Sequence, residues 1–230
     1  MNKKTAVVIG ATGLIGSYLV EELLKDDAFE IVRTLARRPL AMLHPKLQQR
    51  MVNFNDMNDY QEKFGEGDII FCCIGTTQKN VKGDKALYER IDFDIPLNAA
   101  QIGVSKGFKK YLIVSSVGAN ENSSNFYLKL KGKTENALIQ FAFESIGIFR
   151  PSMLLGYRKE SRKGEKVVQR VMKFLSLFLF GSLKKYQAID AKDVAIAMVE
   201  ESKENNIGIH YFDYSRIMSL SDGLHLTEIA

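Results

Sequence analysis

The segment Gly10-Ala-Thr-Gly13-Leu-Ile-Gly16 decides the fold of this chain. It follows Thr5-Ala-Val-Val-Ile9, a short run of apolar and mostly β-branched residues that is typical of a buried strand. Residues 17–24 come next and have the apolar spacing of a helix. A strand, a glycine turn and a helix in this order predict the first unit of an α/β fold with a Rossmann-type, doubly wound parallel sheet.

The three glycines favour a dinucleotide-binding site. The first allows a tight turn, the next lets the backbone approach a pyrophosphate, and the last lets helix and strand pack closely. Phosphates would then lie against the open N–H groups and the positive dipole end of the helix. The first gap, from Gly10 to Gly13, is one residue longer than in the Gly-x-Gly-x-x-Gly pattern. The alternative is therefore a plain glycine-rich turn.

Length and composition limit the classes of protein that this chain can belong to. Its 230 residues suit one domain, residues 1–230, in which about 155–230 forms a smaller, substrate-side portion. The formal net charge of +5 comes without a dense basic block, so we expect no nucleic-acid partner. We expect no signal peptide, and no stretch of the sequence is long enough to span a bilayer, so we expect a cytoplasmic protein without a membrane partner.

The cysteines and histidines do not predict a disulfide or a metal site. Cys72 and Cys73 are adjacent inside an apolar run, where buried thiols are the simplest expectation. His44, His210 and His225 are scattered without acid or cysteine partners at ligand spacing. We therefore predict no metal.

Apolar runs and helical spacings alternate along the rest of the chain. They predict strands at 29–36, 47–54, 68–75, 109–116, 146–156 and 208–214, and helices at 84–106, from 126, at 164–180 and at 191–200. Pro96 marks a bend in the helix at 84–106. The apolar end of the helix at 164–180, Phe174–Phe180, is typical of a core or of a self-association surface, so a homodimer is one expectation.

The end of the second predicted strand bears on cofactor choice. A carboxylate at this place binds the ribose 2′-hydroxyl of NAD, whereas arginine accommodates the 2′-phosphate of NADP. The strand here ends in Arg37 and Arg38, and guanidinium groups match phosphate oxygens with bidentate hydrogen bonds. We therefore expect NADP(H) to be preferred over NAD(H), the alternative being a solvated basic corner. Asn53 and Asp56 either bond an adenine amine or serve as turn residues.

Tyr127 and Lys131 are the candidate catalytic pair. They lie four residues apart in a predicted helix and therefore on one face. An ammonium group beside a phenol stabilises the phenolate and favours proton transfer near neutral pH. Ser116, at the end of the preceding strand, can hydrogen-bond a substrate oxygen. The alternative for the tyrosine and the lysine is an ordinary surface face of a helix.

Together with the glycine turn and the serines, three further stretches resemble an atypical short-chain dehydrogenase/reductase. They are Phe71-Cys-Cys-Ile-Gly-Thr-Thr77, Ser123-Ser-Asn-Phe-Tyr-Leu-Lys-Leu-Lys-Gly132 and Phe149-Arg-Pro-Ser-Met-Leu-Leu155 through Arg162. They are similar to the Tat-interacting-protein oxidoreductase branch and to bacterial relatives labelled NAD-dependent epimerase/dehydratase. The likeness covers residues 4 to about 200.

This resemblance implies a Rossmann domain, a bound NADPH and proton transfer by Tyr127. Ser115 is an alternative to Ser116 as the catalytic serine, and Asp92 stands in the middle helix where many members of the family carry asparagine. The expected cofactor-binding residues are Gly10, Thr12, Gly13, Leu14, Ile15, Gly16, Arg37, Arg38, Ile74, Gly75, Tyr127, Lys131, Leu154 and Arg162.

The leading hypothesis is an NADP(H)-dependent oxidoreductase that acts on a small carbonyl or alcohol. Tyr127 transfers the proton, Lys131 supports it and Ser116 orients the substrate oxygen. One alternative is a nucleoside-diphosphate-sugar epimerase or dehydratase, which needs a larger substrate lobe than this chain offers. Another is an NADPH-binding regulatory or redox-sensing protein with little turnover.

Overall fold

The computed structural model describes residues 3–156 and 181–227, and in it seven parallel strands form one sheet. The order across the sheet is β3-β2-β1-β4-β5-β6-β9. The bounds are β1 (Lys4–Ile9), β2 (Phe29–Ala36), β3 (Leu47–Met51), β4 (Ile69–Cys72), β5 (Lys110–Val114), β6 (Ser145–Phe149) and β9 (Gly208–Phe212). A second, two-stranded parallel sheet pairs β7 (Leu154–Leu155) with β8 (Ile189–Asp190). The predicted Rossmann-type α/β fold is confirmed.

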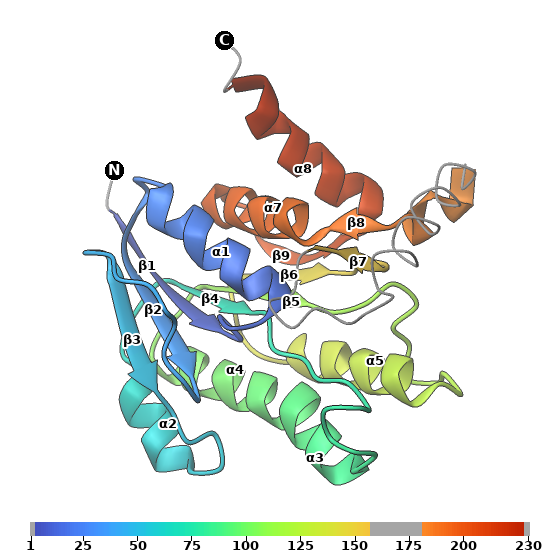
Figure 1. The fold of residues 1–230 in the computed structure, drawn as a ribbon, viewed down its shortest axis with the longest axis horizontal. Coiled ribbons are helices and arrows are strands. Elements are labelled where there is room, and N and C mark those ends of the chain that lie inside the picture. Colours follow the sequence, from blue (N-terminus) through green and yellow to red (C-terminus); the bar gives the residue numbers. More distant parts are fainter. Residues whose placement is uncertain (1–2, 157–180, 228–230) are drawn as a thin grey trace.

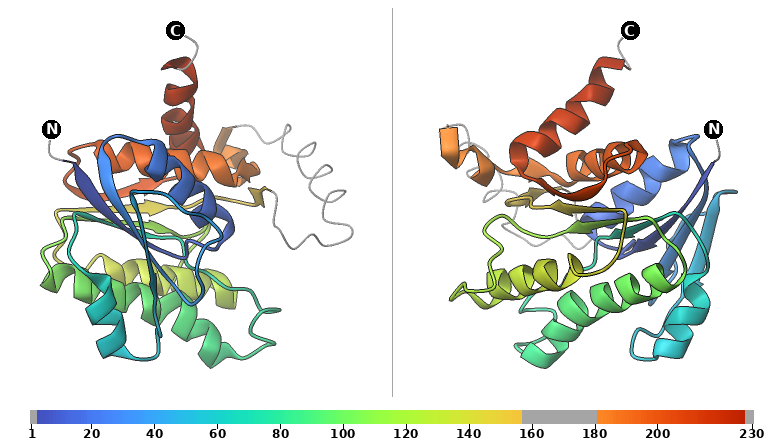
Figure 2. Two further views of the ribbon diagram at one scale, coloured as in Figure 1. Left: turned by 60° about the vertical axis from the view of Figure 1, so that its left-hand side comes forward. Right: turned by 180° about the vertical axis from the view of Figure 1, so that it is seen from behind.

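Helices cover both faces of the large sheet (Figure 1). On one face α1 packs against α7, and on the other lie α2, α4 and α5. Figure 2 shows that α8 projects away from the body of the molecule. The bounds are α1 (Leu14–Lys25), α2 (Met57–Phe64), α3 (Lys85–Glu89), α4 (Ile95–Ser105), α5 (Phe126–Leu138), α7 (Ala191–Lys203) and α8 (Tyr214–Thr227), with a 3₁₀ helix at Gly181–Tyr186.

Two apolar layers hold these helices on the sheet. Because successive side chains of a strand point to opposite faces, Val8 faces α1 and α7 while Val7 and Ile9 face α2 and α4. All three are fully buried, as a strand covered on both faces requires. The continuous apolar runs of the sequence therefore follow from the position of β1 and β4 in the middle of the sheet.

The strand order reverses beside the glycine turn. In the sheet, β2 and β4 lie on opposite sides of β1. The connection that leaves β1 runs toward β2, whereas the connection that leaves β4 runs toward β5, so the two diverge at the carboxyl ends of β1 and β4. Such a reversal is where open α/β sheets bind ligands.

The helix predicted at 84–106 is broken in the middle. The structure has α3, then a π-helical turn at Arg90–Asp94, then α4. The amide of Ile95 donates to the carbonyl of Arg90, five residues back, which widens the helix by one residue. Pro96 directly follows and has no N–H to donate to Asp92. The expected bend is therefore a π turn.

The strand predicted at 146–156 also differs from expectation. It ends at Phe149 and resumes as β7 in the second sheet. Pro151 lies between the two strands and cannot donate a ladder hydrogen bond, although its carbonyl accepts one from the amide of Val117 at 2.9 Å. The C-terminal portion contributes β9 to the large sheet and α7 to its cover.

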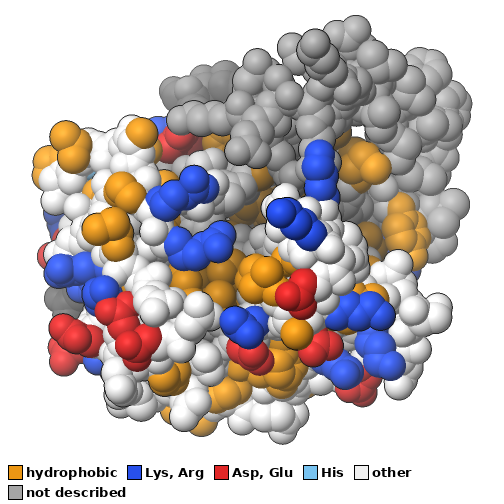
Figure 3. Space-filling view, turned by 60° about the horizontal axis from the view of Figure 1, so that its bottom comes forward, with side chains coloured by type: hydrophobic (Ala, Val, Ile, Leu, Met, Phe, Trp, Pro, Cys, Tyr) orange, Lys and Arg blue, Asp and Glu red, His pale blue; other side chains and the backbone are white. Residues whose placement is uncertain are grey.

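Within the described residues, no helix is long and apolar enough to cross a membrane, and no cluster of His, Cys, Asp and Glu side chains has the makings of a metal site. Cys72 and Cys73 are free thiols, and burial raises the pKa of both. Cys72 is buried in the core as expected, whereas Cys73 is partly buried at its margin. On the face seen in Figure 3, Lys and Arg side chains lie among hydrophobic and acidic side chains.

Candidate dinucleotide and catalytic site

The glycine turn lies against the end of β4 with no room for side chains. Gly10 has a φ of +85°, and a Cβ there would lie 2.6 Å from the backbone of Cys73 and Ile74. A Cβ at Gly16 would lie 2.2 Å from the carbonyl oxygen of Gly10. Real Cβ atoms do not approach so closely, so both positions require glycine. The tight packing that the sequence predicted for these residues is confirmed.

The N-terminus of α1 differs from those of α2, α3, α5 and α7. Gly13 occupies its N-cap without a side-chain hydrogen bond, and the first turn holds no acidic residue. In the other four helices, the N-cap side chain accepts hydrogen bonds from first-turn amides, and these N-caps are Asp56, Asp84, Asn125 and Asp190. The first-turn N–H groups of α1 therefore remain for an anion, with the helix dipole in support. This open, side-chain-free cradle fits the pyrophosphate of a dinucleotide.

Three expected cofactor residues extend this cradle. Thr12 is exposed at the turn, and Leu14 lies beside the end of β7, where a Cβ on Gly156 would be 3.0 Å from its Cδ1. Leu14 and Leu154 pack against the same apolar cluster. Thr12 and Leu14 therefore lie at the N-terminus of α1, and the residue that follows β7, Gly156, lies beside Leu14.

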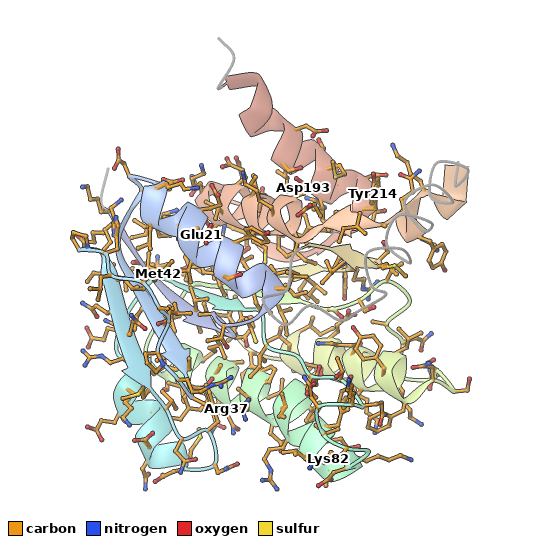
Figure 4. The ribbon with its side chains drawn as sticks, viewed as in Figure 1. Glu21, Arg37, Met42, Lys82, Asp193 and Tyr214 are labelled. Atoms are coloured by element: carbon orange, nitrogen blue, oxygen red, sulfur yellow. The ribbon has the colours of Figure 1, made fainter. Side chains whose placement is uncertain are left out.

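Arg37 and Arg38 follow β2 at the same edge of the sheet, and both are exposed. Figure 4 shows Arg37 at the carboxyl end of β2, toward the layer that contains α4. In the described part of the chain, neither guanidinium has a hydrogen bond or an ion pair. Their positive charge remains available to an anionic ligand.

Asn53 and Asp56 serve local structure. The Asp56 carboxylate caps α2 through the amides of Asn58 and Asp59, and the Asn53 side chain accepts from the amide of Asn55 at 3.2 Å. This agrees with the turn alternative.

A buried ion pair joins α5 to the π turn at Arg90–Asp94. Lys131 Nζ lies 3.1 Å from Asp92 Oδ1, and the two side chains are only 8% and 1% exposed. Asp92 Oδ2 accepts a hydrogen bond from the amide of Thr76 at 2.8 Å. A Cβ on Gly75 would be 3.5 Å from Asp92 Oδ1 and 3.9 Å from Lys131 Nζ, which places Gly75 directly beside the pair, while Ile74 packs against the neighbouring apolar cluster. One carboxylate thus connects the β4 loop, the π turn and α5.

The π turn gives Asp92 this position. Because Pro96 lacks an N–H group, the carbonyl of Asp92 is not used by the regular helical hydrogen bond. It accepts instead from Thr134 Oγ1 on α5, at 3.1 Å. Single π turns within helices occur frequently at functional sites. The irregularity here orients an acid toward Lys131.

The surroundings of Lys131 favour its charged form. Burial alone lowers the pKa of this lysine, but the negative charges of the Asp92 carboxylate and of an ionised Tyr127, with the contact to Asp92, outweigh burial and raise the pKa above its ordinary value. Burial also raises the pKa of Tyr88, which donates to the carbonyl of Thr76 at 3.0 Å. Tyr127 is partly buried beside these groups. The structure therefore brings Tyr127 and Lys131 together, as the sequence predicted.

The two serines after β5 have different surroundings. Ser115 is buried and its hydroxyl donates to Glu135, a buried acid that is also paired with Arg150. Ser116 is half-exposed, and its hydroxyl reaches only the carbonyl of Val117, at 3.3 Å. Ser116 is therefore the serine with a hydroxyl available to a ligand, and Ser115 helps to fix the end of the strand.

Sequence reasoning missed three supporting side chains, Thr134, Glu135 and Arg150. Glu135 follows Lys131 by one helical turn, which was the only available signal for its burial. Arg162 and the apolar stretch Phe174–Phe180 were also predicted to matter, and both lie outside the described residues. Their roles as a phosphate contact and a self-association surface stay predictions.

Comparison with known proteins agrees with this geometry. A family model described as NAD(P)H-binding matches residues 10–170. The chain is 33% identical to protein HTATIP2 of Rattus norvegicus over 186 residues, which cover 80% of this chain and 73% of the relative. It is 30% identical to protein FMP52, mitochondrial, of Candida albicans, over 84% of this chain and 87% of the relative.

A similar solved structure is MoeE5 in complex with UDP-glucose and NAD. Its TM-score is 0.68 at 18% identity, and the match covers 96% of this chain and 81% of that one. At this identity the likeness establishes the fold alone. The described residues contain no membrane-spanning helix, while FMP52 is named as mitochondrial, so the cytoplasmic location stays a prediction.

Proposed function

The chain belongs to the NAD(P)H-binding family, as an atypical short-chain dehydrogenase/reductase related to HTATIP2 and FMP52, and on that premise we propose that it is an NADP(H)-dependent oxidoreductase. The proposed substrate is a small carbonyl compound or alcohol. The observation that carries the proposal is the buried Asp92–Lys131 pair, which holds a charged ammonium beside Tyr127 at the ligand edge of the sheet. Burying two charges is expensive, so a pair placed at this edge favours a functional role.

The residues at the strand ends support NADP(H) as the cofactor. The side-chain-free cradle at Gly10, Gly13 and Gly16 suits the pyrophosphate. Arg37 and Arg38 offer two exposed guanidinium groups where the adenosine ribose of a dinucleotide is bound in this fold. No acid stands at this position to favour the free 2′-hydroxyl of NAD. We therefore propose that the arginines bind the 2′-phosphate.

Each side chain then has a chemical role in carbonyl reduction. A nicotinamide cofactor held at the glycine turn and at Arg37-Arg38 would supply the hydride, an electron pair with its proton, that reduces the carbonyl carbon. Tyr127 donates its phenolic proton to the carbonyl oxygen, which becomes the hydroxyl of the product. Lys131 stabilises the phenolate that remains, and Ser116 donates a hydrogen bond that holds the substrate oxygen in place.

Asp92 acts through Lys131 in this scheme. It keeps the ammonium charged and fixes its direction, since its other oxygen is held by the amide of Thr76. Lys131 Nζ also lies 3.5 Å from the carbonyl of Val114 on β5. The lysine is therefore held from two sides, and little rearrangement is needed when charge develops on Tyr127.

The Tyr127→Phe variant tests the proposal. A screen of small aldehydes, ketones and quinones with NADPH identifies a substrate for the wild-type protein, and the variant is then compared on that substrate. We expect turnover to fall at least about 100-fold, the lower end of what general acid catalysis contributes, while NADPH affinity changes little. Tyr211→Phe is the matched control, since Tyr211 lies on the edge strand β9 under Arg150. Unchanged turnover in the Tyr127 variant would exclude the assignment.

One observation favours a second candidate, a nucleotide-sugar epimerase. The structural neighbour MoeE5 is described with both UDP-glucose and NAD. An epimerase oxidises and re-reduces the same substrate, so its cofactor is carried through purification and is not consumed. Net consumption of NADPH by a carbonyl substrate would exclude this candidate.

A further inference from the structure

The segment that carries Arg37 and Arg38 is held in place by one side chain from the neighbouring strand. Gln49 Oε1 accepts a hydrogen bond from the amide of Leu40 at 2.6 Å. Its Nε2 donates to the carbonyl of Leu40 at 3.4 Å and to the carbonyl of Met42 at 3.0 Å. The side-chain amide of Gln49 therefore bonds three backbone groups of the 40–42 segment, which follows β2 and lies outside the sheet.

The position of Gln49 makes this contact specific. It lies on β3, opposite Thr34 of β2, at the edge of the large sheet. Leu40 and Met42 pack against the apolar cluster on the α1 side of the sheet, so the amide and the apolar contacts act on the same segment. Pro39 restricts the backbone between Arg38 and Leu40. Fixing Leu40 therefore also limits where the two arginines lie.

We propose that Gln49 is a positioning residue for cofactor selectivity: it holds the Arg37-Arg38 segment in the place where the guanidinium groups meet a 2′-phosphate. The inference rests on the proposed function, because it deepens the role given there to the two arginines.

The physical reason is pre-organisation. The arginine side chains have no hydrogen bond or ion pair of their own within the described residues, so only their backbone can direct them. A loop that must be ordered when the ligand binds loses affinity, whereas a loop that is already ordered does not. An ordered 37–42 segment raises the affinity only of a ligand that contacts Arg37 or Arg38. NADPH carries the 2′-phosphate and NADH does not, so Gln49 affects the ratio of their affinities.

The Gln49→Met variant tests this inference, because methionine keeps the length of the side chain and removes its amide. The matched control is Gln48→Met, one residue earlier on β3, where Oε1 accepts from Arg33 Nε at 3.3 Å. Among the described residues, the hydrogen bonds from this strand to the 37–42 segment come from Gln49 and not from Gln48. Calorimetry gives the dissociation constants of NADPH and NADH for the wild type and both variants. Hydrogen exchange of the Leu40 amide in the wild type, without cofactor, is a second measurement that needs no variant.

We expect Gln49→Met to weaken NADPH binding on the order of tenfold and NADH binding less than about twofold, with the ratio unchanged in Gln48→Met. The Leu40 amide is expected to be protected from exchange before cofactor is added. If the wild type prefers NADPH and Gln49→Met keeps the same preference, the inference is overturned and the proposed function is not. Should the variant not fold, an unprotected Leu40 amide in the wild type would overturn it instead. Equal affinities of the wild type for the two nucleotides would reject the proposed NADP preference and the inference together.

Discussion

The two halves of the proposed cofactor site are built in opposite ways. In the buried half, Lys131 and Asp92 are 8% and 1% exposed, and hydrogen bonds from Thr76 and Thr134 fix the acid. In the exposed half, Arg37 and Arg38 stand in solvent on a segment that Gln49 holds through backbone groups. Changing the buried half therefore disturbs the fold, whereas changing the exposed half alters recognition alone.

This difference assigns nucleotide binding and the chemical step to one part of the site and the choice between NADPH and NADH to another. The glycine turn and the buried pair would contact parts of the nucleotide that NADH and NADPH share. The arginines would contact the single phosphate that distinguishes them. A protein built in this way can change its cofactor preference at little cost in stability, because surface substitutions shift stability by less than about 0.5 kcal/mol.

Among the variants of the glycine turn and the buried pair, Gly10→Ala is expected to have the largest effect. A left-handed backbone costs a non-glycine residue about 1–2 kcal/mol, and forcing a methyl group into a packed site costs about 1–3 kcal/mol more. We therefore expect the free energy of unfolding to fall by about 4 kcal/mol, with loss of binding to both nucleotides. Chemical denaturation measures the first effect and calorimetry the second.

Gly83→Ala is the matched control for that substitution. Gly83 has nearly the same φ, +83°, but a Cβ there would meet nothing within 4 Å. It should lose only the backbone contribution, about 1–2 kcal/mol. Equal losses in the two variants would show that close packing of the turn on β4 is not what requires glycine at position 10.

The Asp92→Asn variant should come next in size. Removing one partner of a buried ion pair lowers the free energy of unfolding by about 3–5 kcal/mol. Because asparagine keeps the shape of aspartate, we expect a loss near the lower end, about 3 kcal/mol. NADPH and NADH should lose affinity by the same factor, because the pair is remote from the 2′-phosphate. Glu22→Gln, which removes a surface pair with the mostly exposed Lys25, should cost less than about 1 kcal/mol. A change in the NADPH to NADH ratio in Asp92→Asn would break the division between the two halves.

The pH dependence of that same variant is the smallest of the three effects. The pKa of Lys131 is raised in the folded protein, so its stabilising contribution is complete below the ordinary lysine pKa of 10.5 and is lost as pH rises through the raised value. Asparagine removes the main cause of the raised pKa. The gap in unfolding free energy between wild type and Asp92→Asn should therefore narrow by about 1 kcal/mol between about pH 8 and about pH 11.

Urea titrations of both proteins across this range measure the gap. The buried phenols of Tyr60 and Tyr111, whose pKa values burial raises, also destabilise both proteins at high pH, and subtraction removes that shared effect. A gap that widens with pH would mean that Lys131 does not depend on Asp92 for its charge.

Most of the fold could be predicted from the sequence, because buried parallel strands appear as continuous apolar runs. Phe29–Ala36 was predicted with its observed bounds, and the turn at Gly10 fixed the start of the sheet. The splitting of the helix at 84–106 could not be predicted in detail. Pro96 predicted a bend. The π turn also depends on Thr134, whose hydroxyl donates to the carbonyl of Asp92 from a helix about 40 residues further along the chain.

The candidate site shows the same limit. Tyr127, Lys131 and the glycines were identified from spacing, since each pattern is local. Gln49 was not identified, because a glutamine on an edge strand is typical of a solvent-facing residue, and its three hydrogen bonds form only in the folded chain. Polar residues that bond distant backbone groups leave no periodic pattern in a sequence.

Calorimetric titration of the purified wild-type protein with NADPH and with NADH, after checking for nucleotide carried through purification, tests the central claim most directly. The structure of the turn and the arginine segment predicts tight binding of NADPH and clearly weaker binding of NADH. Binding of neither nucleotide to the cofactor-free protein would contradict the account.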